Sequence, residues 1–209
     1  KAFPTLADRV QTLENILPKE LITAQAAKVP GDLPAKGECL SILSVGRFCD
    51  AKNFDNVPDI CRRLVEDGLH VRWYLIGYGG DEPLIRQKIA EAGMQDRVII
   101  LGKKDNPYPY MRACDLYVQP SRYEGKAVTV REAQLLGKPV VITDYATSGS
   151  QLEDGVDGVI VPMDNVGCTA RIAALLRDPA RMQQLSENCA KRDYTNSAEV
   201  EKIYALMED

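Results

Sequence analysis

Residues 115–143 read DLYVQPSRYEGKAVTVREAQLLGKPVVIT, and this stretch decides the fold class. Its two ends, 115–120 and 138–143, are short and almost continuously apolar, as in strands that a parallel sheet buries on both faces. The residues between them, 126–136, have a helical pattern, and a helix is the usual crossover between two parallel strands. The stretch therefore predicts a strand–helix–strand unit of an α/β domain.

The same alternation continues on both sides of this stretch. Further strands are predicted at 39–46, 71–77, 98–102 and 158–162, and further helices near 54–68, 81–93, 106–113 and 165–177. Successive strands begin roughly 20 to 30 residues apart, which leaves room for a crossover helix each time. The predicted fold class is α/β, with a Rossmann-like doubly wound parallel sheet.

Two regions of different character flank the sheet domain. The first contains a candidate strand, RVQTLEN (9–15), then a helix that begins at Pro18 and a turn-rich linker at 30–34. Because the chain begins at Lys1 without a methionine, we expect it to be a piece of a longer protein. The predicted parts are residues 1–34, the sheet domain 35–195 and a C-terminal helix in 196–209.

Composition excludes several classes of function. The chain has 209 residues, of which 45% are apolar and 27% charged, as in an ordinary globular domain. Its net charge of −4 argues against nonspecific nucleic-acid binding, which needs a basic surface. Six cysteines without a C-x-x-C pair and a single histidine predict reduced thiols in a cytosolic protein and no structural zinc site. No apolar run is long enough to span a bilayer, and no signal peptide is recognisable.

Candidate ligand-binding residues follow the first predicted strand, where a doubly wound sheet binds its ligands. Gly46 and Arg47 come directly after this strand, and Lys52 precedes the next helix. An arginine fork can hold two phosphate oxygens at once, and a lysine adds a compact point charge. The alternative is a loop that carries two solvated charges.

A glycine-rich turn, Gly77-Tyr78-Gly79-Gly80, follows the second predicted strand. Glycine allows a ligand to approach the backbone closely, and the next helix begins with free N–H groups. The turn is equally compatible with a plain tight bend. No G-x-G-x-x-G pattern follows the first strand, which argues against a dinucleotide-dependent dehydrogenase.

Two glutamates, Glu124 and Glu132, lie eight residues apart between the strands of the opening stretch. Carboxylates accept hydrogen bonds from vicinal hydroxyls such as those of ribose. Gly125 exposes the backbone at the helix entry, where N–H groups favour anionic oxygens. Ser121 with Glu124, and Thr129 with Glu132, also fit the capping-box pattern, so an ordinary helix start would produce the same spacing.

The two glutamates in EGKAVTVRE, followed by AQLLGKPVV, resemble the signature of the family-4, or group 1, retaining glycosyltransferases. The resemblance continues in consistent order through VGRFCDAKNF, YLIGYGG, IILGK, MRACDLYVQPSRYEG and DGVDGVIVP. It implies one half of a GT-B fold, in which two Rossmann-like domains face each other across the active site. The variant EGKAVTVREAQ further resembles transferases that build bacterial capsular and surface polysaccharides.

The resemblance also implies a role for individual residues. The implied catalytic residues are Arg47, Lys52 and Glu124. Arg47 and Lys52 would bind the diphosphate of the donor, and Glu124 would face the transferred sugar or its neighbouring phosphate. The implied substrate-binding residues are Gly46, Tyr78, Gly79, Gly102, Lys103, Lys104, Gly125, Lys126, Ala127, Val128 and Glu132, the last of these holding the ribose. Lys126 and Ala127 stand where many members have a glycine or proline and an aromatic residue, which leaves the sugar open.

The implied function is transfer of a sugar from a UDP- or GDP-sugar, with retention, to a glycan or lipid-linked acceptor in surface polysaccharide synthesis. No cofactor or metal is expected, since the chain has no Asp-x-Asp motif. The acceptor would bind a preceding domain that the sequence lacks, so this piece alone is expected to be inactive. The expected location is the cytoplasm or the inner face of the membrane, with peripheral membrane contacts in the acceptor domain. Two alternatives stay open, an epimerase-like GT-B enzyme and a noncatalytic nucleotide-sugar binding module.

Overall fold

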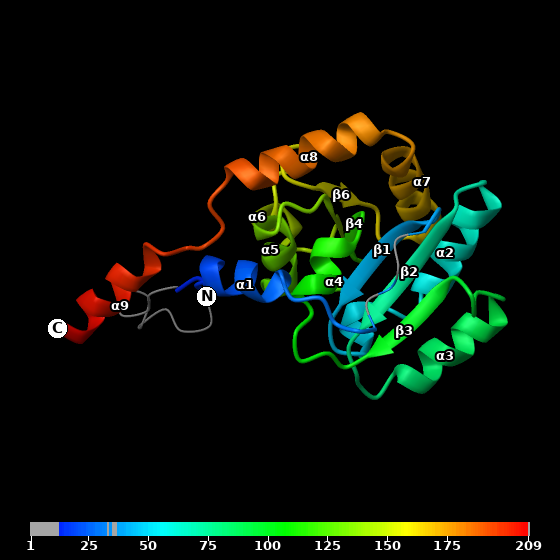
Figure 1. The fold of residues 1–209 in the computed structure, drawn as a ribbon, viewed down its shortest axis with the longest axis horizontal. Helices are drawn as coiled ribbons and strands as arrows, with labels where there is room; N and C mark the ends of the chain where they lie inside the picture. Colours follow the sequence, from blue (N-terminus) through cyan, green and yellow to red (C-terminus); the bar gives the residue numbers. More distant parts are fainter. Residues whose placement is uncertain (1–12, 33, 35–36, 209) are drawn as a thin grey trace.

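The structure, a computed structural model, describes residues 13–32, 34 and 37–208 and has a six-stranded sheet at its centre (Figure 1). The order of the strands is β3-β2-β1-β4-β5-β6, and all five pairings are parallel. The predicted doubly wound α/β sheet is therefore confirmed. The strands are β1 (Leu40–Val45), β2 (Val71–Ile76), β3 (Val98–Gly102), β4 (Leu116–Gln119), β5 (Val140–Thr143) and β6 (Val159–Val161).

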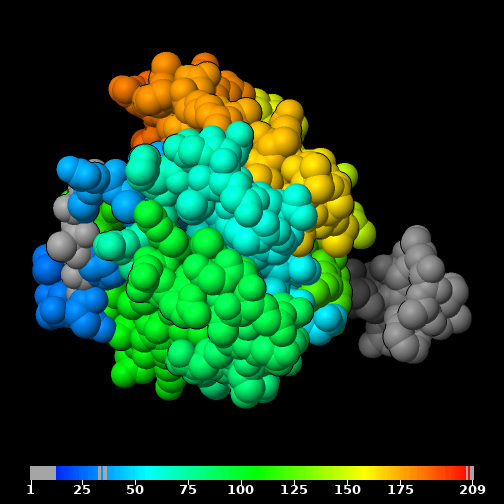
Figure 2. Space-filling model, turned by 90° about the vertical axis from the view of Figure 1, so that its right-hand side faces the viewer, coloured from blue at the N-terminus to red at the C-terminus, as the bar shows by residue number. Residues whose placement is uncertain are grey.

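Helices cover both faces of the sheet. One face packs against α2, α3 and α7, and the other against α4 and α5, so each face has its own apolar core. Figure 2 shows α2 and α3, in cyan to green, at one end of the molecule, with the gold and orange α7 and α8 beside and above them. The helices are α1 (Lys19–Ala26), α2 (Val57–Glu66), α3 (Glu82–Glu91), α4 (Tyr108–Ala113), α5 (Val128–Leu135), α6 (Ser148–Gln151), α7 (Asn165–Leu176), α8 (Pro179–Lys191) and α9 (Glu199–Glu208), with a 3-10 turn η2 at Asp50–Lys52.

The central strand β1 is joined to both neighbours through side chains as well as through the backbone. Ile42 and Leu43 are buried on opposite faces, which explains why the strand reads as a continuous apolar run. The next residue, Ser44, is fully buried, and its hydroxyl donates a hydrogen bond to the carbonyl of Val118 in β4 at 2.5 Å. The indole N–H of Trp73 in β2 donates to the same hydroxyl at 2.9 Å. Strands β2, β1 and β4 are therefore linked inside the core by satisfied polar groups.

The turns after β1 and β2 lie directly against each other. A Cβ atom at Gly77 would lie 1.8 Å from the carbonyl oxygen of Gly46, and one at Gly79 would lie 2.2 Å from that of Phe48. Both glycines also have positive φ angles, 152° and 155°. The amide of Phe48 donates to the carbonyl of Tyr78 at 2.8 Å. Glycine is needed at these two positions because one backbone passes against another.

The two ends of the described chain lie together. The amide of Leu17 donates to the carbonyl of Thr195 at 2.9 Å, and the side chain of Asn196 donates to the carbonyl of Asn15 at 2.9 Å. The candidate strand 9–15 lies largely outside the described residues, and residues 13–18 have no regular structure. Helices α1 and α9 confirm the helices predicted at the two ends, whereas the short α6 and η2 were not predicted.

In the part of the chain that the structure describes, no helix is both long and apolar enough to cross a bilayer.

We expect Gly77→Ala to lower the free energy of unfolding by about 3 kcal/mol or more, because the added methyl meets backbone that cannot move aside. Urea denaturation monitored by circular dichroism measures this change. Gly80→Ala is the matched control, since a Cβ there meets no atom within 4 Å. A Gly77→Ala protein as stable as the Gly80→Ala protein would contradict the close approach.

Candidate functional site

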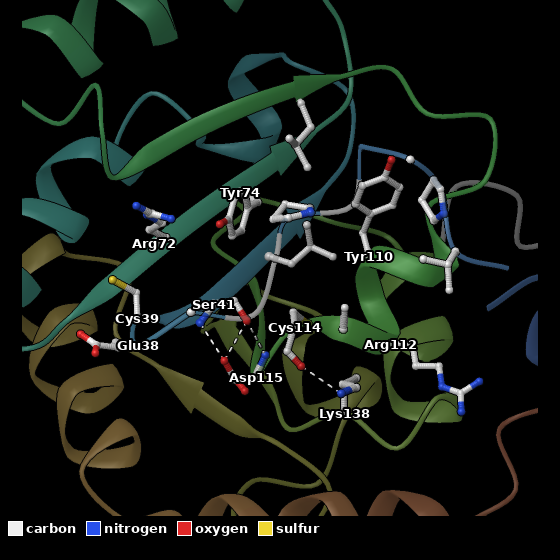
Figure 3. Close-up of a pocket in the computed structure, with 18 residues that line it drawn as sticks. Glu38, Cys39, Ser41, Arg72, Tyr74, Tyr110, Arg112, Cys114, Asp115 and Lys138 are labelled. Atoms are coloured by element: carbon white, nitrogen blue, oxygen red, sulfur yellow. Dashed lines mark hydrogen bonds between the residues drawn. The ribbon is translucent and has the colours of Figure 1, made fainter. Parts of the chain in front are cut away.

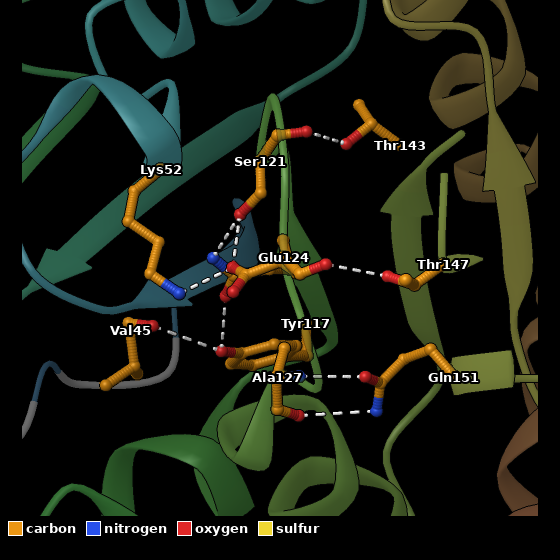
Figure 4. A network of polar contacts seen from close by, with 10 residues as sticks. Val45, Lys52, Tyr117, Ser121, Glu124, Ala127, Thr143, Thr147 and Gln151 are labelled. Carbon is orange, nitrogen blue, oxygen red and sulfur yellow. Dashed lines mark hydrogen bonds and ion pairs between the residues drawn. The ribbon is translucent and has the colours of Figure 1, made fainter. Parts of the chain in front are cut away.

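The loops after β1 and β4 meet in an ion pair. Lys52 Nζ donates to Glu124 Oε1 at 2.5 Å, and the two side chains are 19% and 10% exposed (Figure 4). Strands β1 and β4 are neighbours at the point where the winding of the sheet reverses, and ligands of such sheets bind at this point. The structure thus brings together two of the three residues that were predicted to be catalytic.

The position of Lys52 is fixed by the turn that follows β1. Its aliphatic stem passes over Gly46, where a Cβ atom would lie 3.3 Å from Cδ and Cε of the lysine. Asn53 has a left-handed backbone with φ of 58°, and its side chain donates to the carbonyl of Pro120 at 2.8 Å. Arg122 donates its amide to the carbonyl of Ala51 at 2.9 Å. The two loops are therefore held together by backbone contacts on both sides of the ion pair.

Glu124 is held from below by a chain of buried polar groups. Ser121 Oγ donates to Glu124 Oε1 at 2.7 Å, and the amide of the Gln119 side chain donates to Ser121 Oγ at 2.9 Å. The hydroxyl of Thr147 donates to the backbone carbonyl of Glu124 at 2.7 Å. Figure 4 shows Lys52 and Ser121 at the carboxylate of Glu124 and Thr147 at its backbone carbonyl. Such a network fixes the orientation of a charge before any ligand binds.

The helix α5 begins beside this ion pair without a side-chain cap. The amide of Ala127, just before the helix, donates to Gln151 Oε1 at 2.8 Å, and Gln151 Nε2 donates back to the Ala127 carbonyl at 3.3 Å. Ser121 bonds to the Glu124 side chain, and Thr129 lies inside the helix, so neither capping box of the alternative interpretation forms. The first turn of α5 therefore offers N–H groups to an anionic oxygen.

Glu132 lies further along α5 and has a separate partner. The hydroxyl of Tyr108, the first residue of α4, donates to Glu132 Oε1 at 2.9 Å. Burial raises the pKa of Glu132 above its ordinary value, and the hydrogen bond from Tyr108 lowers it in part. The two glutamates thus serve different contacts, one with a cation and one with a phenol.

The other predicted cations differ in their surroundings. Arg47 is exposed and makes no hydrogen bond or ion pair with any residue that the structure describes. Lys103 is exposed at the end of β3, with its ammonium 5.8 Å from the ring centre of Tyr78. Lys104 instead pairs with Asp32, and Lys126 pairs with Glu14 at 2.9 Å. The last two lysines are therefore turned toward the N-terminal segment.

The remaining predicted residues lie on the same edge of the sheet. Gly102 ends β3 with a φ of 71°, and its carbonyl accepts from the amide of Gly77 at 3.0 Å. Gly125 and Val128 are exposed, whereas Ala127 is buried with its amide already engaged. A sugar hydroxyl could reach the backbone at the first two positions but not the amide of the third.

Sequence reasoning missed three groups that shape this site. Thr147 and Gln151 hold the loop from more than twenty residues further along the chain, with no local pattern to mark them. Tyr108 was assigned only to a helix. A tyrosine at the start of a helix that follows a strand end was the one available signal.

Among the described residues, no three His, Cys, Asp or Glu side chains cluster in a way that could hold a metal ion. All six cysteines are free. Burial raises the pKa of Cys61, Cys114 and Cys168 to about 12, so these thiols stay protonated and are poor nucleophiles.

A cavity of about 970 Å³ lies at the other end of the strands. Cys39, Ser41 and Arg72 line it from the beginnings of β1 and β2, and Tyr110 lines it from α4 (Figure 3). It lies at the amino ends of the strands. Because open α/β sheets bind ligands at the carboxyl ends, we place the candidate site at the ion pair.

Residues 28–192 match the model of the family described as glycosyl transferases group 1. The chain belongs to this family. An alpha-D-kanosaminyltransferase of Streptomyces kanamyceticus is 29% identical over 152 residues, which are 71% of this chain and 39% of the relative. A lipopolysaccharide core biosynthesis mannosyltransferase of Rhizobium meliloti is 31% identical over 128 residues, which are 60% of this chain and 36% of the relative. The chain thus spans less than half the length of these group 1 glycosyltransferases.

Solved structures of glycosyltransferases share the fold. Anabaena HepE, crystallised with UDP and glucose, superposes with a TM-score of 0.81 at 20% identity, over 97% of this chain and 58% of that protein. The C-terminal domain of a group 1 glycosyl transferase from Francisella tularensis gives a TM-score of 0.64 at 19% identity, over 79% of this chain and 86% of that one. At these identities the likeness shows the fold, which is one Rossmann-like unit of the GT-B architecture.

We expect the Lys52–Glu124 pair to show a coupling energy of about 1–3 kcal/mol in a double-mutant cycle on stability. Lys52→Met leaves a nearly buried carboxylate without its cation, and Glu124→Gln leaves the cation without its carboxylate. The double variant removes both charges and should recover much of the loss. Urea denaturation of the four proteins measures the coupling.

The exposed pair of Arg86 and Glu82 on α3 provides the control cycle, with side chains 60% and 33% exposed. Its coupling should stay below about 0.5 kcal/mol. Equal coupling in the two cycles would show that the Lys52–Glu124 pair is no stronger than a surface pair.

We expect Glu132→Gln to stabilise the protein near neutral pH. A glutamate whose pKa is raised on folding gives stability that is complete below its unfolded pKa and is lost as the pH rises through its folded pKa. Glutamine does not titrate and can still accept from Tyr108. The stability advantage of the variant should therefore grow from pH 4 to pH 7, in thermal melts at each pH. The exposed Glu187→Gln, on α8, controls for loss of a negative charge, and a pH-independent difference would contradict the assignment.

Proposed function

We propose that this chain is the donor-binding half of a retaining glycosyltransferase that acts on a nucleoside-diphosphate sugar. The observation that carries the proposal is the buried Lys52–Glu124 pair beside the uncapped start of α5, where the winding of the sheet reverses. Cations and free N–H groups at one strand edge suit a diphosphate, and family membership supplies the reaction class.

Lys52 and Arg47 are proposed to bind the diphosphate. An ammonium has three N–H donors, and Glu124 occupies one of those of Lys52, so two stay available for phosphate oxygens. Arg47, exposed on the same turn, adds a fork with two parallel donors. The start of α5 near Gly125 adds backbone N–H groups.

These groups would stabilise the transition state by their fixed positions. When the bond between the anomeric carbon and the diphosphate breaks, negative charge grows on the departing phosphate and the sugar becomes cationic. Donors that are already in place stabilise the departing charge, and one such donor is commonly worth about 3 kcal/mol of barrier. Glu124, held by Ser121, would face the sugar and its neighbouring phosphate. Glu132 would accept from the ribose hydroxyls.

The base would lie along the ends of β2 and β3. Tyr78 and Gly79 form one side of this edge, and Gly102 and Lys103 form the other, joined by the hydrogen bond from Gly77 to Gly102. These residues offer a ring face and backbone groups, which are compatible with more than one base. We propose UDP or GDP as the nucleotide of the donor. A solved neighbour crystallised with UDP and glucose supports a UDP-sugar, and a relative named as a mannosyltransferase supports a hexose as the transferred sugar.

The proposal extends to the whole protein. Residues 1–34 would lead in from an acceptor-binding domain, 35–195 would bind the donor, and 196–209 would return to that domain. Relatives named for lipopolysaccharide and amylovoran synthesis support a surface or capsular glycan, or a lipid-linked precursor, as the acceptor. Six free cysteines favour a reducing compartment, which supports a cytoplasmic site of action at the inner face of the membrane.

Calorimetry with UDP and GDP tests the proposal. We expect one of them to bind in the micromolar to millimolar range, and Lys52→Met to weaken it about tenfold or more, since a charge-assisted contact to phosphate is lost. Binding of the corresponding nucleoside, which has no phosphate, should change much less.

Lys88→Met is the matched control, because Lys88 is an exposed lysine on α3 that pairs with Glu91. It should bind like the unaltered chain. Absence of binding by both nucleotides at millimolar concentration, or an equal effect of Lys52→Met on nucleotide and nucleoside, would refute the proposed diphosphate site.

A further inference from the structure

The contact between Tyr108 and Glu132 joins two helices on one face of the sheet. Tyr108 opens α4, and Glu132 lies in the second turn of α5. The phenol donates to one carboxylate oxygen, Oε1, at 2.9 Å. The other oxygen, and a second lone pair of the first, stay available to a ligand.

The phenol is held in place by its own surroundings. Its ring packs, half-buried, against the apolar core beneath α4 and α5. Its amide donates to the side chain of Asn106 at 3.3 Å, and that side chain donates to the carbonyl of Gln25 in α1 at 3.0 Å. The start of α4 is therefore tied to α1, which fixes the backbone from which the Tyr108 side chain reaches Glu132.

The contact also acts on the charge of Glu132. Burial favours the neutral acid and raises the pKa of this glutamate, whereas a donated hydrogen bond favours the carboxylate and lowers it. Burial and the nearby Glu132 raise the pKa of Tyr108 to about 12, so the phenol keeps its proton and remains a donor. A neutral carboxylic acid would be a much poorer acceptor for two hydroxyls.

We propose that Tyr108 is a positioning residue for ribose recognition, which holds one oxygen of Glu132 in place and leaves the other to the ribose hydroxyls. This inference rests on the proposed function, in which Glu132 reads the ribose of the donor nucleotide. Tyr108 itself touches no reacting atom in this scheme. Without its hydroxyl, the glutamate is free to rotate and is protonated more easily, so its discrimination between ribose and deoxyribose weakens.

Tyr108→Phe removes the hydroxyl and keeps the packed ring. The probes are UDP and 2′-deoxy-UDP, with the corresponding GDP pair, in calorimetry. We expect the unaltered chain to lose about tenfold or more in affinity when the 2′-hydroxyl is absent, and the variant to lose roughly threefold or less. The exposed Tyr204→Phe on α9 is the matched control and should keep the full discrimination.

A pH series and a second background separate this role from a merely structural one. In Tyr108→Phe the loss of nucleotide affinity on acidification should begin at a higher pH, because the hydrogen bond that lowered the pKa of Glu132 is gone. In a Glu132→Ala background there is no carboxylate for the phenol to orient, so Tyr108→Phe should change neither the pH profile nor the discrimination further.

The outcomes distinguish this inference from the proposed function. Nucleotide binding with unchanged ribose discrimination and an unchanged pH profile in Tyr108→Phe would overturn the role of Tyr108 alone. An effect of equal size in the Glu132→Ala background would also overturn it, since the phenol would then act through another group. Failure of the unaltered chain to bind either nucleotide would overturn the proposed function, and this inference with it.

Discussion

The pairing of β1 with β4 is the contact on which the arrangement of the site depends. These strands are 74 residues apart at their paired positions, where Ile42 lies beside Leu116 and Leu43 beside Tyr117. Asp115 fixes the start of this pairing, since its carboxylate accepts from the amide and the hydroxyl of Ser41, both at 2.8 Å. Because the chain crosses to the opposite face of the sheet between β3 and β4, β1 and β4 lead to helices on opposite faces, and the carboxyl ends of the two strands form an open edge of the sheet. Lys52 and Glu124 meet across that edge.

The polar groups under this edge contribute little to the stability of the fold, but they are held in fixed orientations. A nearly buried ion pair contributes little net stability, because removing two charges from water costs about as much as their attraction returns. Its effect is to hold a cation where a diphosphate would bind, without reorganisation at the moment of reaction. The buried Ser121 and Gln119 serve the same purpose, as does the pairing of Gln151 with the backbone before α5. Glu132 follows this logic too, since a buried carboxylate is a liability for stability and an asset for reading hydroxyls.

The sequence predicted the sheet well because both-face burial leaves continuous apolar runs. All six strands and the crossover helices α2 to α5 were found within a few residues, whereas the short crossover helix α6 was not. The spacing of glutamates and cations pointed to the edge of the sheet where Lys52 and Glu124 meet. It could not decide between a capping box and a ligand site, because Ser121 precedes Glu124 by three residues in either case. Only the position of Gln151, 24 residues after Ala127, settles where α5 begins. Likewise, no local pattern distinguishes Lys52 from Lys126, whose partner Glu14 lies at the opposite end of the chain.

The two walls of the open edge are built in different ways. On the β1–β2 side, backbone lies against backbone at Gly77 and Gly79, so side-chain exchange cannot reshape the turns. On the β4–β5 side, the loop around Glu124 is tied by the side chains of Thr147 and Gln151, which a point mutation can replace. Substitutions can therefore reshape the β4–β5 side of the edge more easily than the β1–β2 side. The side proposed to meet the nucleotide and phosphate is held by backbone contacts and tolerates little change. The side proposed to meet the sugar is held by side chains that can be replaced. A change of transferred sugar therefore needs no change in the framework of the sheet.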